Sequence, residues 1–178
     1  MEVVVSRLKA LIRDIPEFPR PGVTFKDITP LLADADALSY CVESLAESFS
    51  DRRVDKVLGI EARGFIIAAP VAVRLGAGFV PLRKGGKLPW KVHAEAYNLE
   101  YGVDTLEVHQ DAVSPSEHVL IIDDVLATGG TATAAARLVS HMGAEPVGFG
   151  CVLELSVLGG RKRLLDSDLD AVSLVSYD

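Results

Sequence analysis

The sequence predicts an α/β protein with a central, mostly parallel sheet flanked by helices. Short uncharged runs of aliphatic and β-branched residues, such as 57–60 and 119–122, are typical of strands buried on both faces. Segments with apolar residues at helical spacing alternate with these runs, an order that produces parallel strands joined by helices. The 178 residues suffice for one core but not for two ordinary domains, so we expect a single domain over residues 1–178.

The N-terminal segment predicts two helices separated by a stiff loop. Apolar residues recur at helical spacing between Val4 and Ile15, which indicates the first helix. Prolines at positions 16, 19 and 21 end that helix and make the following loop irregular. Asp36 is expected to cap the second helix. The inner face of that helix consists of Leu38, Cys41, Leu45 and Phe49.

The middle of the chain predicts two strands, a helix between them and a hairpin. The strands are expected at 57–60 and 79–82, and the helix at 64–75. Pro81 favours an irregular or edge position for the second strand. Residues 89–110 are polar with alternating apolar side chains, a pattern that is typical of an exposed hairpin.

The C-terminal part predicts alternating strands and helices once more. Strands are expected at 119–122, 147–155 and 171–177, with a helix at 132–142 and a short basic helix at 161–165. Ligands of such sheets bind at the carboxyl ends of the strands. Asp123, Arg63 and Arg83 each fall just beyond a predicted strand. We therefore expect these three side chains to converge on one site.

The charge distribution points to an anionic small molecule rather than to nucleic acid. The net charge of −7 argues against non-specific nucleic-acid binding. Residues 62–94 nevertheless contain six cations and no acid, which leaves −13 for the rest of the chain. Apolar runs are too short for a membrane span, and the two cysteines are widely separated. The N-terminal residues show no basic region followed by a long apolar run, so we expect no export signal. We expect a cytoplasmic protein with one positively charged site for a polyanion.

Residues 119–133 combine a buried strand, two adjacent carboxylates and a glycine turn that opens into a helix. Asp123 and Asp124 follow the strand, and Thr128–Thr131 precedes the helix. The first N–H groups of a helix have no partner within it and lie at the positive end of its dipole, so they bind anions. Carboxylates there would repel bare phosphate but accept sugar hydroxyls, which predicts a sugar-phosphate site. The alternative is an Asp-rich turn that merely caps the helix.

This block resembles the phosphoribosyl-pyrophosphate (PRPP) motif of the type I phosphoribosyltransferases. Nearly the whole chain resembles one branch of that family, the adenine phosphoribosyltransferases. The segments that carry this likeness are 18–30, 61–65, 83–89 and 99–102, together with the Asp-Asp block. The combination is more specific than the PRPP motif alone, which many phosphoribosyltransferases share.

The resemblance implies a type I phosphoribosyltransferase fold with an N-terminal hood over residues 1–34 and a flexible lid hairpin over about 89–110. It implies a purine-salvage enzyme that converts adenine and PRPP to AMP and pyrophosphate. Mg²⁺ would be held mainly through PRPP, without dedicated protein ligands. The partners would be these small molecules and a second copy in a homodimer, with neither nucleic acid nor membrane. Such enzymes often have a non-proline cis peptide at the turn that is Glu61–Ala62 here.

The resemblance also implies residue roles. Asp123 and Asp124 would accept the ribose hydroxyls. The residues that bind the 5′-phosphate would be Ala127, Thr128, Gly129, Gly130 and Thr131. The residues that bind pyrophosphate would be Arg63, Arg83, Lys84 and Lys87, with Arg83 acting across the dimer interface. The residues that bind adenine would be Thr24, Phe25, Lys26 and Leu155, although the family commonly has Arg in place of Lys26. The catalytic residues would be Glu100, Tyr101 and Arg63.

Two alternatives remain open at this point. Enzymes of the same fold that use hypoxanthine, guanine or xanthine share the phosphate-binding parts, and a comparison of bases in a turnover assay separates them. A non-catalytic PRPP-sensing regulator that binds DNA is the other alternative. It would need a basic DNA-binding extension, which this acidic chain lacks.

Overall fold

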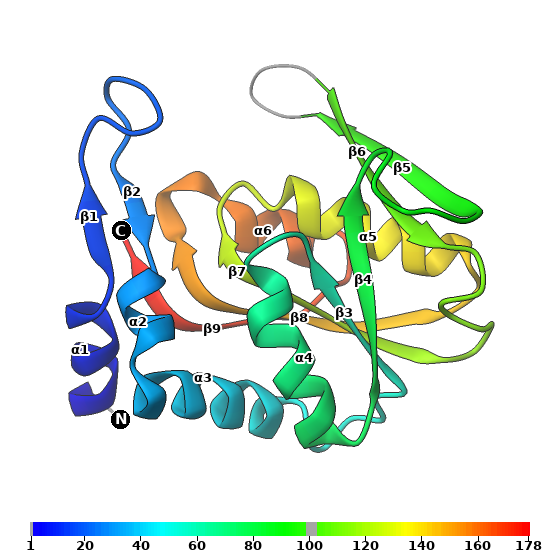
Figure 1. Cartoon of the computed structure of the whole chain (residues 1–178), viewed down its shortest axis with the longest axis horizontal. Coiled ribbons are helices and arrows are strands. Elements are labelled where there is room, and N and C mark those ends of the chain that lie inside the picture. Colours follow the sequence, from blue (N-terminus) through cyan, green and yellow to red (C-terminus); the bar gives the residue numbers. More distant parts are fainter. Residues whose placement is uncertain (1, 99–102) are drawn as a thin grey trace. The chain divides into compact units, whose positions relative to one another are not determined.

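The computed structural model describes residues 2–98 and 103–178 (Figure 1). The chain divides into two compact units, Met1–Cys41 and Val42–Asp178. The division falls within one helix, α3 (Ala35–Ser48).

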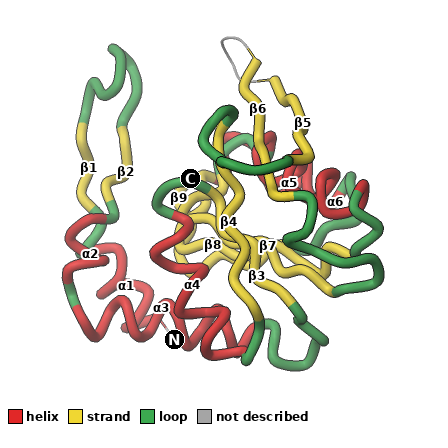
Figure 2. Tube along the Cα trace, turned by 45° about the vertical axis from the view of Figure 1, so that its right-hand side comes forward, coloured by secondary structure: helices red, strands yellow, loops and turns green. Residues whose placement is uncertain are grey.

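The first unit contains two short helices and a two-stranded antiparallel ribbon (Figure 2). Its elements are α1 (Glu2–Ala10), β1 (Arg13–Ile15), β2 (Phe25–Asp27), α2 (Thr29–Ala33) and the start of α3. The predicted first helix is thus too long, because Ile15 lies in β1 and pairs with Phe25. The expected cap was also wrong. Asp34 rather than Asp36 accepts the Ala37 N–H, at 2.8 Å, because α3 begins at Ala35, one residue before Asp36.

The second unit is built on a seven-stranded sheet in the order β5-β6-β4-β3-β7-β8-β9. Five strands are parallel, and β5 and β6 are antiparallel to each other, with β6 antiparallel to β4. The strands are β3 (Lys56–Ile60), β4 (Gly78–Lys84), β5 (Val92–Asn98), β6 (Val103–His109), β7 (His118–Leu126), β8 (Glu145–Leu155) and β9 (Ala171–Tyr177). The helices are α4 (Gly64–Leu75), α5 (Gly130–His141), the short 3₁₀ helix η1 (Ser156–Leu158) and α6 (Gly160–Leu165). The predicted mostly parallel α/β fold is confirmed.

Alternation along β3 places helices on opposite faces of the sheet. Leu58 and Ile60 belong to the buried cluster that includes Leu138 of α5. Gly59 points the other way, and a Cβ there would lie 2.7 Å from the Ala68 Cβ of α4. Because side chains alternate along a strand, α4 and α5 cover different faces, and α4 lies close enough to require glycine.

Two expectations about the sheet need correction. The hairpin of β5 and β6 forms as predicted, but Tyr97, Leu106 and Val108 are buried in the core, since the hairpin packs on α5. Strand β4 lies inside the sheet rather than at its edge. Its pairing with β6 involves Arg83 and Lys84, beyond Pro81, so the proline does not have to donate to that neighbour.

Within the described part of the chain, no helix combines the length and the apolar composition needed to cross a membrane.

Candidate active site

A crevice opens where two neighbouring strands stop pairing. Strand β7 pairs with β3 as far as Ile122 and with β8 as far as Leu126. Beyond Ile122, β7 therefore pairs with β8 but no longer with β3, as expected beside a ligand crevice at the carboxyl ends of parallel strands. A pocket of about 320 Å³ occupies this position. Its lining includes Glu61, Arg63, Lys84, Tyr97, Asp104, Asp123, Asp124 and Thr131.

A second pocket lies against the glycine loop, by which we mean Ala127–Thr131. This pocket of about 120 Å³ is lined by all five residues of the loop. Gly129 has a φ of 75°, a conformation that L-residues other than glycine rarely adopt, and α5 begins at the next residue. The two pockets share Asp123, Val125 and Thr131. A ligand with two separated anionic groups can thus occupy both.

The paired carboxylates have different environments. Burial and the neighbouring charge of Asp124 raise the pKa of Asp123 well above its usual range. The Asp123 Oδ1 accepts the backbone N–H of Asp124 at 2.8 Å. Asp124 is 4% exposed and forms an ion pair with Arg63, with Oδ2 and Nη2 2.8 Å apart. A Cβ at Gly64 would lie 2.9 Å from the Asp123 Oδ1, so glycine at the start of α4 leaves room for that carboxylate.

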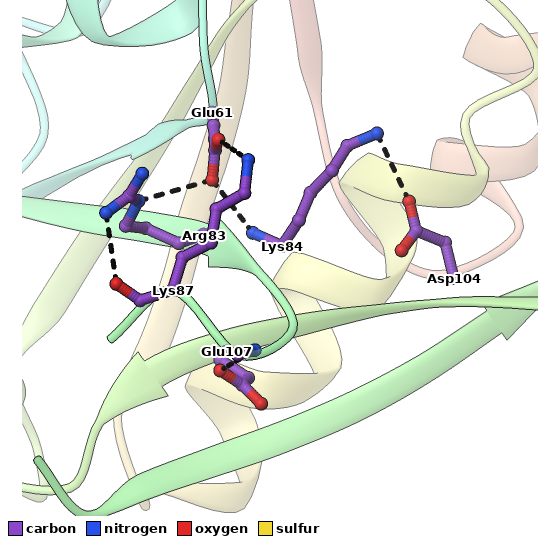
Figure 3. A network of polar contacts seen from close by, with 7 residues as sticks. Glu61, Arg83, Lys84, Lys87, Asp104 and Glu107 are labelled. Atoms are coloured by element: carbon purple, nitrogen blue, oxygen red, sulfur yellow. Dashed lines mark hydrogen bonds and ion pairs between the residues drawn. The ribbon is translucent and has the colours of Figure 1, made fainter. Parts of the chain in front are cut away.

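Glu61 holds the cationic residues at the end of β4 and in the turn that follows it (Figure 3). Its carboxylate accepts Arg83 Nε at 3.2 Å and the Lys84 N–H at 3.0 Å, and it pairs with the Lys87 ammonium. Burial alone would raise the pKa of Glu61, but these three donors outweigh it and lower the pKa to about 2. The Arg83 Nη1 also donates to the Lys87 carbonyl at 3.1 Å. The Glu61–Ala62 peptide is cis, as the resemblance predicts.

A second chain of contacts links the cations to the glycine loop. Lys84 Nζ lies 3.3 Å from Asp104 Oδ2, and the Tyr97 hydroxyl donates to the same oxygen at 3.3 Å. Burial and the nearby Asp104 and Asp123 carboxylates raise the pKa of Tyr97, and a hydrogen bond with Thr131 opposes them. Tyr97 and Asp104 face each other across the hairpin. The paired strands of the hairpin, β5 and β6, therefore form one wall of the larger pocket.

Most of the predicted phosphate and ribose residues converge. Arg63, Lys84, the aspartates and the glycine loop line the two pockets, whereas Arg83 and Lys87 reach them through Glu61. Glu100 and Tyr101 lie outside the described residues. The predicted adenine residues fall in both units: Thr24, Phe25 and Lys26 in the first, and Leu155 in the second. Their joint contact with one base stays a prediction.

Sequence reasoning missed three residues of the site: Glu61, Tyr97 and Asp104. Glu61 immediately precedes residues 62–94, which contain six cations and no Asp or Glu. This position could have indicated a carboxylate that pairs with those cations. Tyr97 and Asp104 are seven positions apart, and their contact follows only from the register of the hairpin. That register is not visible in the residue pattern.

Known proteins similar to this chain share one enzymatic family. Residues 26–176 match the family model of the phosphoribosyl transferase domain. An adenine phosphoribosyltransferase from Thermobifida fusca is 57% identical over 172 residues, which cover 97% of this chain and 98% of the relative. The crystal structure of the enzyme from Rhodothermus marinus superposes with a TM-score of 0.94 at 48% identity and covers 99% of this chain and 100% of that chain. The Saccharomyces cerevisiae enzyme, solved with an imino-altritol bisphosphate and adenine, has a TM-score of 0.89 at 34% identity, with 98% and 99% covered.

Proposed function

The chain belongs to the adenine phosphoribosyltransferases, enzymes of purine salvage, and on that premise we propose which of its residues perform the transfer. The reaction converts adenine and PRPP to AMP and pyrophosphate. The single observation that supports the assignment best is the pair of adjoining pockets, one lined by the glycine loop and the other by carboxylates and cations. PRPP has the matching order of groups, namely a 5′-phosphate, a ribose diol and a pyrophosphate.

The glycine loop binds the 5′-phosphate through main-chain N–H groups at the start of α5 and the hydroxyls of Thr128 and Thr131. The Asp123 and Asp124 carboxylates accept the ribose hydroxyls. Arg63 neutralises part of the Asp124 charge, which limits the repulsion between the paired acids and the phosphates. It also offers its planar guanidinium to the pyrophosphate.

Cleavage of the bond between C1′ and pyrophosphate develops positive charge on the ribose, as in glycoside cleavage, and negative charge on the leaving group. Arg63, Lys84 and Lys87 stabilise the leaving group, with Arg83 acting across the proposed dimer interface, and this stabilisation grows as the charge of the leaving group develops. Glu61 holds the Arg83 guanidinium, the Lys87 ammonium and the main chain of Lys84 in position. The aspartates on the other wall of the pocket face the electron-poor ribose. Both charges of the transition state thus meet complementary side chains.

Magnesium is part of the proposal. The larger pocket contains carboxylate oxygens, the ligand type that this ion prefers. Pyrophosphate oxygens and water would be its principal ligands, and Asp123 and Asp124 would be carboxylates of the same pocket. When bound, the ion supplies further neutralisation of the departing pyrophosphate.

The remaining assignments concern the base and the lid. Phe25 and Leu155 sandwich adenine, and the main chain at Thr24 and Lys26 contacts its edge. Glu100 accepts or orients the proton that leaves the ring, and Tyr101 covers the site. Closure of the hairpin excludes water that would hydrolyse PRPP. The position of Tyr97 and Asp104 supports this role of the hairpin, because both residues lie on its paired strands and line the pocket.

The assembly and the location of the enzyme belong to the same proposal. We propose a homodimer in which Arg83 contributes to the pyrophosphate site of the partner. The cytoplasm is the proposed location, which is favoured by two cysteines that are both buried and unpaired.

The experiment that tests this function is conversion of adenine and PRPP to AMP by the purified chain, with and without magnesium. Hypoxanthine and guanine serve as competing substrates. We expect AMP formation that requires magnesium and a rate with adenine that exceeds the other rates by orders of magnitude. Equal turnover of all three bases would instead assign the chain to a broader purine specificity.

A further inference from the structure

We propose that Gly160, the first residue of α6, is a positioning residue for the glycine loop, and that Arg161 locks α6 in the position that this requires. The inference rests on the proposed role of the glycine loop in binding the 5′-phosphate. It assigns a function to a helix that contributes no residue to the lining of either pocket described above.

The main chains of Gly160 and the glycine loop are in direct contact. A Cβ at Gly160 would lie 2.2 Å from the Ala127 carbonyl oxygen and 3.0 Å from the Gly129 nitrogen. Conversely, a Cβ at Gly129 would lie 2.8 Å from the Gly160 carbonyl oxygen. Real Cβ atoms essentially never lie closer than 3.0 Å to a neighbouring heavy atom. The loop can therefore keep its conformation only if residue 160 has no side chain.

The cluster around Arg161 determines which of the two segments would move. Arg161 Nε donates to Glu154 Oε1 at 3.0 Å, Nη1 donates to the Ala171 carbonyl at 2.6 Å, and Nη2 donates to Ser173 Oγ at 2.8 Å. Ser173 Oγ in turn donates to Glu154 Oε2 at 2.7 Å, and Glu154 is 5% exposed. These bonds fix α6 to β8 and β9, because breaking them would leave a buried carboxylate without its partner.

A side chain at position 160 would consequently displace the loop rather than the helix. The loop holds phosphate through several main-chain N–H groups, whose hydrogen bonds depend steeply on distance and angle. The cations that hold pyrophosphate come from the turn after β3, the end of β4 and the turn that follows β4. None of these segments supplies one of the three atoms nearest to a Cβ at Gly160, which belong to Leu126, Ala127 and Gly129. The affinities for AMP and for pyrophosphate should therefore respond differently to a side chain at position 160.

Calorimetric titrations of the purified full chain test this, with AMP as one ligand and magnesium pyrophosphate as the other. Gly160→Ala should raise the Kd for AMP by about tenfold or more, the size expected when a packed site is overfilled. The Kd for pyrophosphate should stay within about twofold. Gly159→Ala is the control for backbone strain in the same segment: a Cβ there is strained at a φ of +70°, but it meets nothing within 4 Å and so does not press on the glycine loop. It should keep its affinity for AMP.

Three results would overturn the proposal: unchanged AMP affinity in folded Gly160→Ala, an equal loss for both ligands, or an equal loss of AMP affinity in Gly159→Ala. Should Gly160→Ala fail to fold, Ser173→Ala loosens the Arg161 cluster without adding volume. It should weaken AMP binding by about two- to fivefold, the worth of one hydrogen bond, with pyrophosphate binding unchanged. Unchanged AMP affinity in that variant contradicts the proposal equally.

A loop variant separates this proposal from the function on which it rests. Thr128→Ala combined with Thr131→Ala removes two hydroxyl donors from the glycine loop itself. If that variant loses AMP affinity while Gly160→Ala does not, the positioning role fails and the phosphate site stands. If neither variant loses AMP affinity, the glycine loop is not the phosphate site.

Discussion

Both adjacent aspartates are assigned to bind the ligand, although the ionised form of Asp123 lowers the stability of the folded state. The pKa of Asp123 is raised by burial and by Asp124, so its ionised form costs the folded state free energy. For a carboxyl group with a raised pKa, this cost appears as the pH rises above the value in the unfolded chain, about 3.9, and persists at neutral pH. The residue is retained, we infer, because the ribose hydroxyls need an acceptor there.

Asp123→Asn should therefore raise the Tm at neutral pH by a few degrees, the shift expected for about 1 kcal/mol in a domain of this size. The same variant should lose PRPP affinity and turnover severely, more so when combined with Asp124→Asn. Thermal unfolding at neutral pH and near pH 3.5 checks the first part, since the gain should shrink in acid. Wild-type kinetics in the double variant would remove the aspartates from the ribose site.

Ionisation of Glu61 has the opposite effect on stability from ionisation of Asp123. Its pKa is lowered to about 2, because contacts with Lys87, Lys84 and Arg83 outweigh the effect of burial. Its ionised form therefore stabilises the folded state above the ordinary value of 4.5, and this contribution is lost as the pH falls towards 2. Glu61→Gln should lower the stability at neutral pH and flatten its dependence on pH between these values. Denaturant titrations of both proteins across this range provide the measurement, and parallel curves would contradict the assignment.

At the scale of elements, the close approach of α4 to β3 depends on a single glycine. A Cβ at Gly59 would lie 2.7 Å from the Ala68 Cβ and 2.8 Å from Phe79 Cε2. Gly59→Ala should reduce the free energy of unfolding by about 1–3 kcal/mol through overpacking. Gly85→Ala is the control, since its nearest contact would be 3.6 Å away. Equal stability of the two variants in urea would show that α4 can retreat without cost.

The elements differ in how well the sequence predicts them. Helix α4 and strand β9 have the predicted bounds, because their apolar patterns end at clear polar or glycine boundaries. Strand β7 is longer than predicted, since Val125 and Leu126 continue to pair with β8 after the aspartates. The ribbon of β1 and β2 was missed because three residues per strand are too few to show a period.

The residues of the candidate site also differ in how well the sequence predicts them. The glycine loop and Asp123 could be predicted because they are contiguous in sequence and form a recognisable block. The contact of Glu61 with Lys87, 26 positions away, depends on the pairing of β3 with β4. The contact of Tyr97 with Asp104 depends on the register of the hairpin of β5 and β6. Such contacts follow from tertiary register, which residue types and spacing do not encode locally.

At the scale of the whole molecule, charge is separated between one cationic window and an acidic remainder. Residues 62–94 carry +6 in a chain of −7. Such a separation attracts a polyanion to one place while the rest of the surface repels it. Salt should therefore weaken pyrophosphate binding by several-fold between about 0.05 and 0.5 M KCl, because the Debye length falls over this range. Adenine binding should be nearly insensitive. Fluorescence or calorimetric titrations at several salt concentrations can compare the two, and equal salt dependence would argue against electrostatic attraction by the window.

We assign the phosphate of a bound nucleotide to Ala127–Thr131 and its ribose hydroxyls to Asp123 and Asp124. A crystal structure of the protein with AMP tests it most directly. We predict phosphate density against the main-chain N–H groups at the start of α5 and both ribose hydroxyls within hydrogen-bond distance of the carboxylates. AMP bound elsewhere, with the glycine loop free of phosphate, would contradict this assignment.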